Sequence, residues 1–504
     1  MTTLVPQYDQ GATGAVNRPF NQKLAEQVSV LDFGAVGNGT TDDTAAIQAA
    51  LNTGKNVYFP NGYTFGITSE LTITTSNVTL FGGGVISFLA TYNTVGNTLL
   101  SAITITGSNV IFNNINFNGS NITVASVTNR FIWFKAPKSK VSNCSFINLV
   151  GAGSNFNGAI QADANAAYLI VTSSYFENCP GAVFCQGSNC IMSNNNVLNP
   201  KDVCFTFNGP NAKYGVITGN SINNLNLNSA GALIDAEESA SYWTISNNVI
   251  NGVKNGIGIG ALNVAVNTDV TGGVISGNVI NGGFGTTSNP TTLIYVSAHY
   301  FNTLITDNLL SGLPIGSSGS AYITISATGG RVTNNIIDAT AYTGVALMLV
   351  TVGSKGLTIE NNTFTTVSAS RHVLFNAGDY TGLPVTFSGG RFQGGVEGIN
   401  TALNSPTNLG IFLQNITEYT GANFLNTPFL GDISAYFNTY NAITFPHSIK
   451  SHVSVYGNAA PTSIVKSNAV GDIVYNYNPV VGQPKAWVCT VAGAPGTWVS
   501  QGNL

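Results

Sequence analysis

A six-residue pattern recurs along the middle of this chain and constrains its fold more than any other feature. It reads apolar, small polar, polar or glycine, asparagine or small, any residue, apolar, and successive copies begin 21 to 30 residues apart. Self-similarity at a period of about 20–50 residues is typical of solenoids and repeat arrays. The eleven copies are FNNINF (112–117), VSNCSF (141–146), VTSSYF (171–176), MSNNNV (192–197), ITGNSI (217–222), ISNNVI (245–250), ISGNVI (275–280), ITDNLL (305–310), VTNNII (332–337), IENNTF (359–364) and FSGGRF (387–392).

The residue types of the repeat indicate strands. The units are rich in β-branched residues, asparagine and glycine and lack a helical pattern. Asparagine and glycine tolerate the positive φ that chain corners need, and asparagine side chains can hydrogen-bond from coil to coil. The flanking Ile, Val and Phe are predicted to form an apolar core, and an array of antiparallel hairpins lacks the turn signals it would need. With weaker copies at 80–85 and 412–417, the sequence predicts an all-β, single-stranded parallel β-helix of about a dozen coils.

The composition favours a hydroxyl-rich partner. Only 8% of the 504 residues are charged, so we expect a surface of Asn, Ser and Thr that suits polysaccharide. Seventeen Lys and Arg against 21 Asp and Glu give a net charge of −4, which argues against nucleic acid. The one basic cluster, Arg130, Lys135, Lys138 and Lys140, is expected on a solvated loop.

The remaining composition argues against cofactors and membranes. The six cysteines show no paired metal spacing and are interpreted as buried reduced thiols, so we expect neither a metal nor a cofactor. The N-terminus lacks a basic region followed by an apolar stretch, so no signal peptide is expected. No run of 18 apolar residues occurs, so membrane insertion is not expected.

The segment 28–68 is the most specific local motif. Residues 40–43 are predicted to cap a helix whose Ala45, Ala46, Ile47, Ala49 and Ala50 cover the open end of the first coil. Asp42 and Asp43 are therefore interpreted as structural, favoured at the helix N-terminus. The predicted domains are a lead-in (1–28), the β-helix with its cap (29–430) and a small β-rich C-terminal module (431–504).

Three segments carry a resemblance to a known family. DFGAVGNGTTDDTAAIQAA (32–50), GATGAVNR (11–18) and the stretch 471–500 are similar to segments of the pectate-lyase-like β-helix proteins common among bacteriophage tailspikes. The resemblance implies a right-handed β-helix and a homotrimer that recognises, and usually cleaves, a bacterial surface polysaccharide. It also implies a virion protein made in the host cytoplasm. The short lead-in suggests attachment to the phage tail, the baseplate or another tailspike.

A second column of segments indicates where the chemistry lies. In each, the first and third residues are apolar or small and should face the core, so that the second and fourth face outward. The segments are IQAD (160–163), VFCQ (183–186), FTFN (205–208), IDAE (234–237), IGIG (257–260), IYVS (294–297) and ITIS (323–326). The outward glycines Gly258 and Gly260 should leave room for a sugar ring beside the acids of IDAE.

The scarce carboxylates Asp235, Glu237 and Glu238 are the candidate catalytic residues. Glycoside hydrolysis needs two carboxyl groups, and residues i and i+2 on one strand face lie about 7 Å apart, within the window of about 6.5–9.5 Å of inverting enzymes. Glu237 is the candidate acid because it lies nearer the loop. Alternatively, these residues only solvate the surface. Asp163 is the reserve acid.

Six further residues are candidate substrate contacts. Gln186 and Asn208 offer polar groups on the outward face, and Phe184 and Tyr295 offer exposed aromatic platforms that a trimer could also bury. His299 could orient a substrate carboxylate or act as a base, or be an ordinary surface residue. Trp243 could stack on sugar or pack in the core.

The leading hypothesis is an endo-acting glycoside hydrolase that cleaves capsule or O-antigen during host recognition. A polysaccharide lyase acting on a uronate-containing glycan ranks second, because no arginine falls in the aligned column. An esterase ranks third, because no nucleophile motif is present. A receptor-binding spike without catalysis is the alternative outside enzymes. Residues from about 400 onward are expected to supply much of the trimer contact.

Overall fold

The computed structural model describes most of the chain. The described residues are 6–92, 99–122, 128–149, 158–224, 232–253, 256–262, 269–282, 292–312, 321–340, 346–351, 354–366, 371–376, 385–394, 397–400, 411–414, 418–419, 423–426, 434–435, 454–457, 459–460, 470–476, 478–493 and 496–504. They divide into two compact units, residues 1–207 with 211–216 and residues 208–210 with 217–504.

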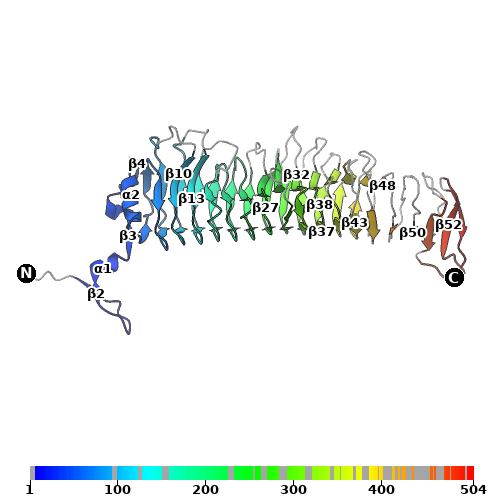
Figure 1. Ribbon diagram of the computed structural model, residues 1–504, viewed down its shortest axis with the longest axis horizontal. Helices are drawn as coiled ribbons and strands as arrows, with labels where there is room; N and C mark the ends of the chain where they lie inside the picture. Colours follow the sequence, from blue (N-terminus) through cyan, green and yellow to red (C-terminus); the bar gives the residue numbers. More distant parts are fainter. Residues whose placement is uncertain are drawn as a thin grey trace, which may run out of the picture. The chain divides into compact units, whose positions relative to one another are not determined.

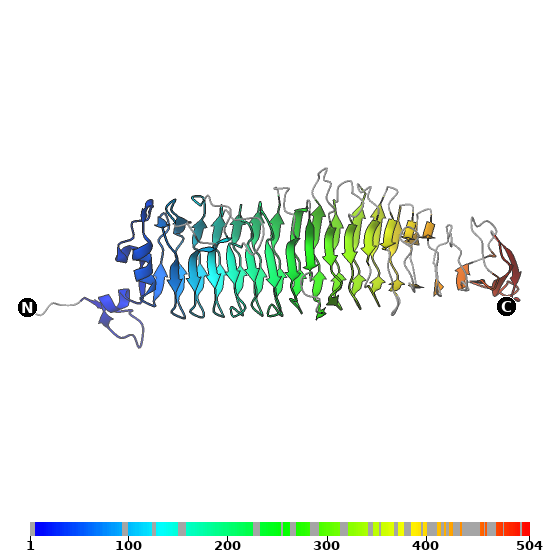
Figure 2. The same ribbon diagram turned by 45° about the horizontal axis from the view of Figure 1, so that its top comes forward.

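Each unit is a parallel β-solenoid of the right-handed type, whose coils contribute one strand to each of three parallel sheets, here called S1, S2 and S3. Strands of successive coils lie side by side in Figures 1 and 2. The predicted all-β parallel β-helix is therefore confirmed. The domain boundaries at 28/29 and 430/431 stay predictions.

In the first unit, S1 contains β7 (Leu71–Ile73), β10 (Leu99–Ile105), β13 (Thr128–Phe134), β16 (Ile160–Ala162), β19 (Val183–Cys185) and β22 (Phe205–Asn208), whose last residue belongs to the second unit. S2 contains β3 (Gln27–Ser29), β5 (Asn56–Tyr58), β8 (Thr79–Phe81), β11 (Ile111–Asn113), β14 (Lys140–Ser142), β17 (Ile170–Thr172) and β20 (Ile191–Ser193). S3 contains β4 (Asn38–Asp42), β6 (Thr64–Ile67), β9 (Val85–Phe88), β12 (Asn116–Asn118), β15 (Ser145–Ile147), β18 (Tyr175–Glu177) and β21 (Asn196–Leu198).

In the second unit, S1 contains β25 (Ala232–Glu237), β28 (Ile257–Leu262), β32 (Thr292–Val296), β36 (Ala321–Ile325), β39 (Ala346–Val350), β42 (Arg371–Phe375), β45 (Glu397–Asn400) and β48 (Asn423–Asn426). S2 contains β23 (Val216–Thr218), whose first residue belongs to the first unit, β26 (Thr244–Ser246), β30 (Val274–Ser276), β34 (Leu304–Thr306), β37 (Arg331–Thr333), β40 (Thr358–Glu360), β43 (Val385–Ser388) and β46 (Ile411–Gln414). S3 contains β24 (Ser221–Asn223), β27 (Val249–Val253), β31 (Val279–Gly282), β35 (Leu309–Ser311), β38 (Ile336–Ala339), β41 (Thr363–Thr366), β44 (Arg391–Gln393) and β47 (Glu418–Tyr419).

The remaining elements lie outside the three sheets. Short strands β29 (Val270–Thr271) and β33 (Tyr300–Phe301) pair in parallel. Near the C-terminus, β49 (Ser434–Ala435), β50 (Ser454–Gly457), β51 (Ile473–Asn476), β52 (Ala486–Val491) and β53 (Thr497–Ser500) form one sheet, in which β51, β52 and β53 pair antiparallel. This sheet confirms the predicted small β-rich C-terminal module.

The repeated hexapeptide is the corner between S2 and S3. Its first residue is an inward core residue of S2, and its third residue turns the chain with a positive φ, as at Asn143 (56°) and Asn247 (55°). Glycine takes the same position at Gly219, Gly277 and Gly389, because it adopts this conformation without steric cost. The sixth residue, such as Ile250, is again in the core. The in/out register predicted for the repeat is confirmed.

The fourth residue of the repeat forms the predicted asparagine ladder in the second unit. The amide nitrogen Nδ2 of each side chain donates to Oδ1 of the next, at 2.9–3.0 Å, through Asn220, Asn248, Asn278, Asn308, Asn335 and Asn362. These side chains are at most 1% exposed. The ladder therefore satisfies the buried amides that would otherwise destabilise the coil interior.

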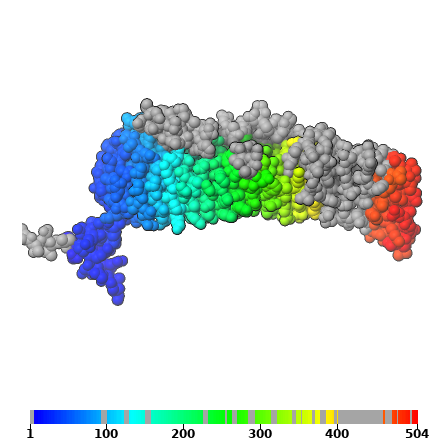
Figure 3. Space-filling view, in the orientation of Figure 1, coloured from blue at the N-terminus to red at the C-terminus, as the bar shows by residue number. Residues whose placement is uncertain are grey.

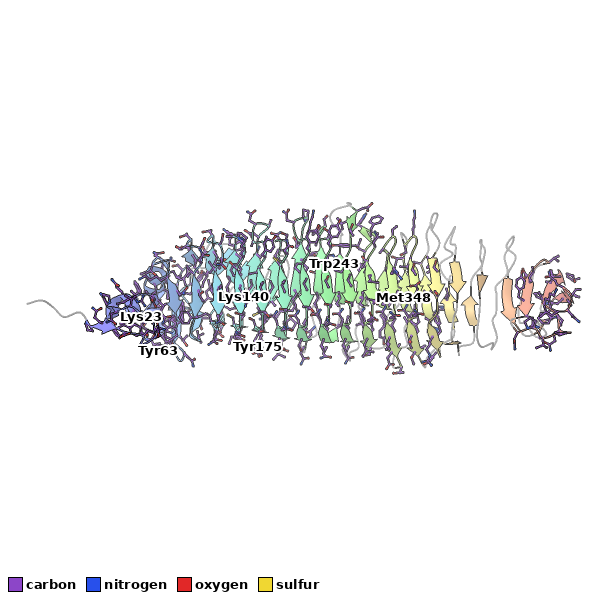
Figure 4. The ribbon with its side chains drawn as sticks, turned by 90° about the horizontal axis from the view of Figure 1, so that it is seen from below. Lys23, Tyr63, Lys140, Tyr175, Trp243 and Met348 are labelled. Carbon is purple, nitrogen blue, oxygen red and sulfur yellow. The ribbon has the colours of Figure 1, made fainter. Side chains whose placement is uncertain are left out.

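The core between the sheets is apolar, as predicted. In the first unit the rings of Phe117, Phe146 and Phe176 stack from coil to coil, with centroids 5.0 Å apart. All six cysteines are free and buried, which confirms the prediction of buried reduced thiols. Described side chains of neighbouring coils form a continuous surface in Figure 3, while side chains such as Tyr175 and Lys140 point outward in Figure 4.

The N-terminal cap forms as expected in outline. Before it, β1 (Gln7–Tyr8) and β2 (Arg18–Pro19) pair antiparallel and lead into α1 (Phe20–Leu24) and η1 (Val30–Phe33). Helix α2 (Thr44–Leu51) packs against η1 and β7 and buries Ile47, Ala50 and Leu51. Ala45 and Ala49, which were expected over the open end, are exposed.

Asp43 is structural, as interpreted; it is the N-cap residue of α2, but its side chain makes no hydrogen bond to the helix. Its carboxylate accepts the backbone N–H groups of Val36 (2.6 Å), Gly37 (3.1 Å) and Gly66 (3.3 Å), and the residue is 1% exposed. Asp42 accepts instead from Thr44 at the start of α2. Asp43 thereby ties the loop before α2 to the second coil.

Candidate functional site

The candidate site is built on S1 of the second unit, where the observed register differs from the expected one. Ile234 pairs with Ile259, so Asp235 lies opposite Gly260 and Glu237 opposite Leu262. The expected outward pair of Gly258 and Gly260 is therefore wrong by a slip of two residues. A Cβ at Gly258 would meet the core residues Ile280 and Val253, so only Gly260 of the expected pair faces outward. The repeated Ile-Gly dipeptide conceals the slip in the sequence.

Three other alignments of this column are confirmed. In the first unit Gln161 pairs with Phe184, and Phe184 with Thr206, and in the second unit Tyr295 pairs with Thr324. The alignment of β28 with β32 is wrong by the same two residues, because Gly260 and not Gly258 pairs with Tyr295. Hence Gly260 lies between Asp235 and Tyr295 on one face of S1, and it carries no side chain there.

The three candidate carboxylates lie at the end of β25. Ile234 and Ala236 are fully buried in the core, so the alternating Asp235 and Glu237 project from the other face of the strand. Asp235 is only 2% exposed, whereas Glu237 is half-buried. Glu238 follows in a turn with a φ of 51°. Asp235 and Glu237 therefore share one face, while Glu238 begins the turn beyond them.

Asn208 positions the Glu237 carboxylate. Its Nδ2 donates to Oε1 of Glu237 at 2.9 Å, and the backbone N–H of Gly209 donates to the Glu237 carbonyl oxygen at 3.1 Å. Asn208 is 5% exposed. A buried amide with a fixed donor orients this carboxylate and stabilises its ionised form. The sequence-predicted residues Asn208 and Glu237 are therefore in direct contact.

Tyr300 lies behind the acidic strand and was missed from the sequence. Its hydroxyl donates to the carbonyl oxygen of Ala236 at 2.9 Å, and its side chain is fully buried. Burial, together with the charges of Asp235, Glu237 and Glu238, raises the pKa of the Tyr300 hydroxyl. Tyr300 comes from β33, outside the aligned column, so no spacing in the sequence linked it to β25.

Trp243 packs against Tyr300 in the interior. Its ring lies 5.9 Å from that of Tyr300 at an interplanar angle of 76°, and the side chain is 1% exposed. No ring face is open for a sugar to stack on. This geometry favours the packing alternative for Trp243.

Tyr295 and His299 lie close to Tyr300 in the sequence, and the two side chains have different surroundings. Tyr295 is half-buried on S1, one strand beyond Gly260. His299 Nδ1 lies 3.1 Å from Oδ1 of Asp269, so a neighbouring carboxylate orients its ring. Tyr295 is thus the partly exposed neighbour of Gly260 on this face.

Three predicted site residues belong to the first unit. Asp163 accepts a hydrogen bond from Nε1 of Trp133 at 2.6 Å, and Gln186 is half-buried. Phe184 was expected to be an exposed platform, but it is only 7% exposed, so that expectation is wrong. Alternation places its side chain outward, yet neighbouring atoms cover it.

Two searches of the described residues were negative. They contain no group of three or more His, Cys, Asp or Glu side chains that could hold a metal ion. None of their helices is both long enough and apolar enough to cross a membrane.

Comparisons with known proteins agree with this architecture. Residues 27–259 match the family model described as rhamnogalacturonase A/epimerase, pectate lyase-like. No curated protein matches the chain in sequence.

Several solved structures are similar. A tailspike mutant of E. coli bacteriophage HK620 in complex with a hexasaccharide is 15% identical, with a TM-score of 0.53, covering 98% of this chain and 95% of that one. Tailspike protein 3 of bacteriophage CBA120 is 13% identical, with a TM-score of 0.48, covering 99% and 73%. The A-module of a mannuronan C-5 epimerase from Azotobacter vinelandii is 17% identical, with a TM-score of 0.49, covering 80% and 100%. At these identities the likeness concerns the fold. The chain is a parallel β-helix, and its residues 27–259 are similar to the pectate lyase-like family model.

Proposed function

We propose that this protein is a phage tailspike that binds and endo-hydrolyses a bacterial surface polysaccharide, capsule or O-antigen. The observation that carries the proposal is the carboxylate pair Asp235 and Glu237 on one face of β25, with Asn208 bonded to Glu237. The fold of a tailspike complexed with a hexasaccharide, which this chain shares, supports a glycan as the ligand.

The geometry suits inverting hydrolysis. Alternate residues of a strand lie about 7 Å apart, which leaves room for a water between a general acid and a general base. The environments of the two carboxyl groups also differ. Asp235 is only 2% exposed, whereas Glu237 is half-buried and its carboxylate accepts a hydrogen bond from Asn208.

The proposed roles follow from these environments. Asp235 protonates the leaving glycosidic oxygen, and Glu237 activates the attacking water. This assignment reverses the roles expected from the sequence, where nearness to the loop was the only criterion. Gly260 lies between Asp235 and Tyr295 on this face, where the Leu262 side chain packs close to it, and Glu237 and Tyr295 are the half-buried residues that a sugar would reach.

The test uses the full chain and a panel of purified capsular polysaccharides and O-antigens. Release of reducing ends without ultraviolet absorbance from an unsaturated product is expected of a hydrolase. Asp235→Asn and Glu237→Gln should each abolish this release and keep glycan binding. Asp307→Asn is the matched control, because Asp307 is an exposed corner residue at a position where Asn334 and Asn361 stand in later coils.

The other outcomes identify the alternatives. An unsaturated product would show a lyase, and binding without any cleavage would show a receptor-binding spike. Cleavage by the Asp235→Asn and Glu237→Gln double variant at the wild-type rate would move the active site elsewhere.

The proposal includes a homotrimer carried on the virion, attached to the phage tail, the baseplate or another tailspike. The expected contribution of Phe184 to such an interface is lost, because that residue is already buried. An apolar stripe on S3 of the second unit supports assembly instead. It consists of four residues in ladder register that are 38–50% exposed: Val249, Val279, Leu309 and Ile336.

Light scattering should give the mass of three chains. A stable monomer at micromolar concentration would contradict the trimer. Val279→Lys should weaken assembly, because it places a charge within the stripe, whereas Asn251→Lys on the adjacent strand β27, outside the stripe, should not.

A further inference from the structure

Arg130 is not on a solvated loop, contrary to the expectation for the basic cluster. It lies on β13 of S1 in the first unit, opposite Ser101 of β10, and is only 1% exposed. Burial lowers the pKa of its guanidinium to about 10, against the opposing effect of the Asp163 and Glu70 charges. Lys138 and Lys140, by contrast, are exposed as expected.

The guanidinium has no polar partner within the described part of the chain. Its Nε and Nη1 atoms are buried without a hydrogen bond, and no carboxylate of a described residue lies within ion-pair distance. The two nearby carboxylates are engaged elsewhere. Asp163 accepts from Nε1 of Trp133, and Glu70 accepts from the Thr104 hydroxyl. A buried cation whose donors are unmet is costly unless something outside the protein meets them.

Two cations, Arg130 and Lys135, lie over the indole ring of Trp133. The Lys135 ammonium lies 3.5 Å and the Arg130 guanidinium 4.3 Å from the centre of the indole ring. Trp133 and Lys135 are both half-buried, so the cluster reaches the surface through them.

The strand neighbour of Trp133 adds an unmet acceptor. Gln161 lies opposite Trp133 in the ladder and is 9% exposed, and its Oε1 is buried without a hydrogen bond. One small region thus holds unmet guanidinium donors and an unmet amide acceptor. A ligand that carries both an anionic acceptor and hydroxyl donors complements both.

We propose that Arg130, Trp133, Lys135 and Gln161 form a binding site for an acidic sugar unit, with the sugar carboxylate at Arg130 and a sugar hydroxyl donating to Gln161. The site rests on the proposed function only in taking a glycan as the ligand. It lies in the first unit and contains neither Asp235 nor Glu237. No arginine falls within the aligned column of segments, but Arg130 lies on S1, the sheet that contains this column.

The test measures binding of short oligogalacturonate and oligoglucuronate to the full chain by calorimetry, each beside its carboxyl-reduced neutral form. At least one acidic oligosaccharide should bind more tightly than its neutral form. Arg130→Met should lower that acidic affinity roughly tenfold or more, because a charge-assisted hydrogen bond is lost. Lys140→Met removes one exposed positive charge from β14, the next strand of the chain, which belongs to S2, and should change nothing.

A second variant separates the two halves of the site. Gln161→Leu should weaken binding of acidic and neutral forms alike, because it removes only the hydroxyl acceptor. Arg130→Met should also keep or raise the unfolding temperature without ligand, since replacing a buried unpaired ion by an apolar side chain is often neutral or stabilising.

Equal binding of acidic and neutral forms to the wild type, or unchanged acidic binding by Arg130→Met, would overturn the site. The Asp235→Asn and Glu237→Gln double variant should bind the acidic oligosaccharides as the wild type does. Failure of hydrolysis with this binding intact would therefore count against the proposed reaction and not against the Arg130 site.

Discussion

Residue types repeat from coil to coil at the corner between S2 and S3. On the outward face of S1, they differ from coil to coil. Through six rungs of the second unit, the third residue of the repeat at this corner is a positive-φ asparagine, glycine or, once, aspartate (Asp307), and the fourth is a buried asparagine. On S1 the outward residue changes from Asp235 to Gly260 to Tyr295 in consecutive strands. The backbone that the corner stabilises therefore leaves S1 free to carry individual side chains.

The largest expected effect comes from breaking the corner. Ile245 is the first residue of its hexapeptide and is fully buried, so Ile245→Asp places a charge in the coil interior at a cost of several kcal/mol. We expect no soluble assembled protein in expression and size-exclusion analysis. Ser246→Asp, at the half-buried outward neighbour, should assemble. Normal assembly of the Ile245→Asp protein would show that the coil tolerates a charge in its core.

The next largest effect belongs to S1 and concerns turnover alone. Asp235→Asn or Glu237→Gln should lower the rate of glycan cleavage at least about 10²-fold, the usual effect of a positioned acid or base. The unfolding midpoint should stay close to that of the Asp307→Asn control. A large loss of stability in either variant would mean that the acids support the coil and would remove the contrast between the two regions.

A variant in the asparagine ladder should lose stability and keep turnover, which is the reverse of the effect expected for the Asp235 and Glu237 variants. Asn278 accepts from Asn248 and donates to the carbonyl oxygen of Ile245 and to Asn308. Asn278→Ala leaves buried polar groups unmet, so we expect a loss of about 2–4 kcal/mol in denaturant unfolding with turnover retained. Asn247→Gly, at the positive-φ corner position beside it, should be neutral or slightly stabilising. Equal effects of both changes would show that the ladder adds nothing.

The smallest effect tests the link between the core and the acids. Tyr300→Phe removes only the hydroxyl that donates to Ala236, which should cost about 1 kcal/mol. Because Ala236 lies between Asp235 and Glu237, we expect a modest fall in turnover with unchanged glycan affinity. Tyr322→Phe, another fully buried tyrosine of the second unit, is the control for loss of a hydroxyl. An unchanged cleavage rate would remove Tyr300 from the positioning role.

The fold could be predicted because its information is periodic. Every copy of the hexapeptide predicts the same corner, so an incorrect assignment of one copy is recognised by comparison with the others. The face of Asp235 and Glu237 also followed from alternation with Ile234 and Ala236. Periodicity failed where the sequence repeats itself over two residues, as in β28, because two registers of the repeated Ile-Gly dipeptide fit the same pattern.

The rest of the site depends on contacts that alternation does not encode. Outward direction did not imply exposure for Phe184 or Asp235, which neighbouring atoms cover. Tyr300 reaches β25 from a strand outside the column, and Arg130 appeared in the sequence as part of a basic run. The burial of a side chain and its hydrogen-bond partners depend on how the coils pack, so they could be identified only from the structure.

The asparagine ladder has a direction, which bears on how such a chain changes length in evolution. Every amide nitrogen from Asn220 to Asn335 donates toward the C-terminal neighbour, so each coil presents the same donor at one end and the same acceptor at the other. Removing the 30-residue step from Asn278 to Asn308 would bring Oδ1 of Asn308 to the place where Asn248 donates. Whole coils are thus interchangeable modules that join head to tail, and gain or loss of one moves the residues of S1 without altering the join.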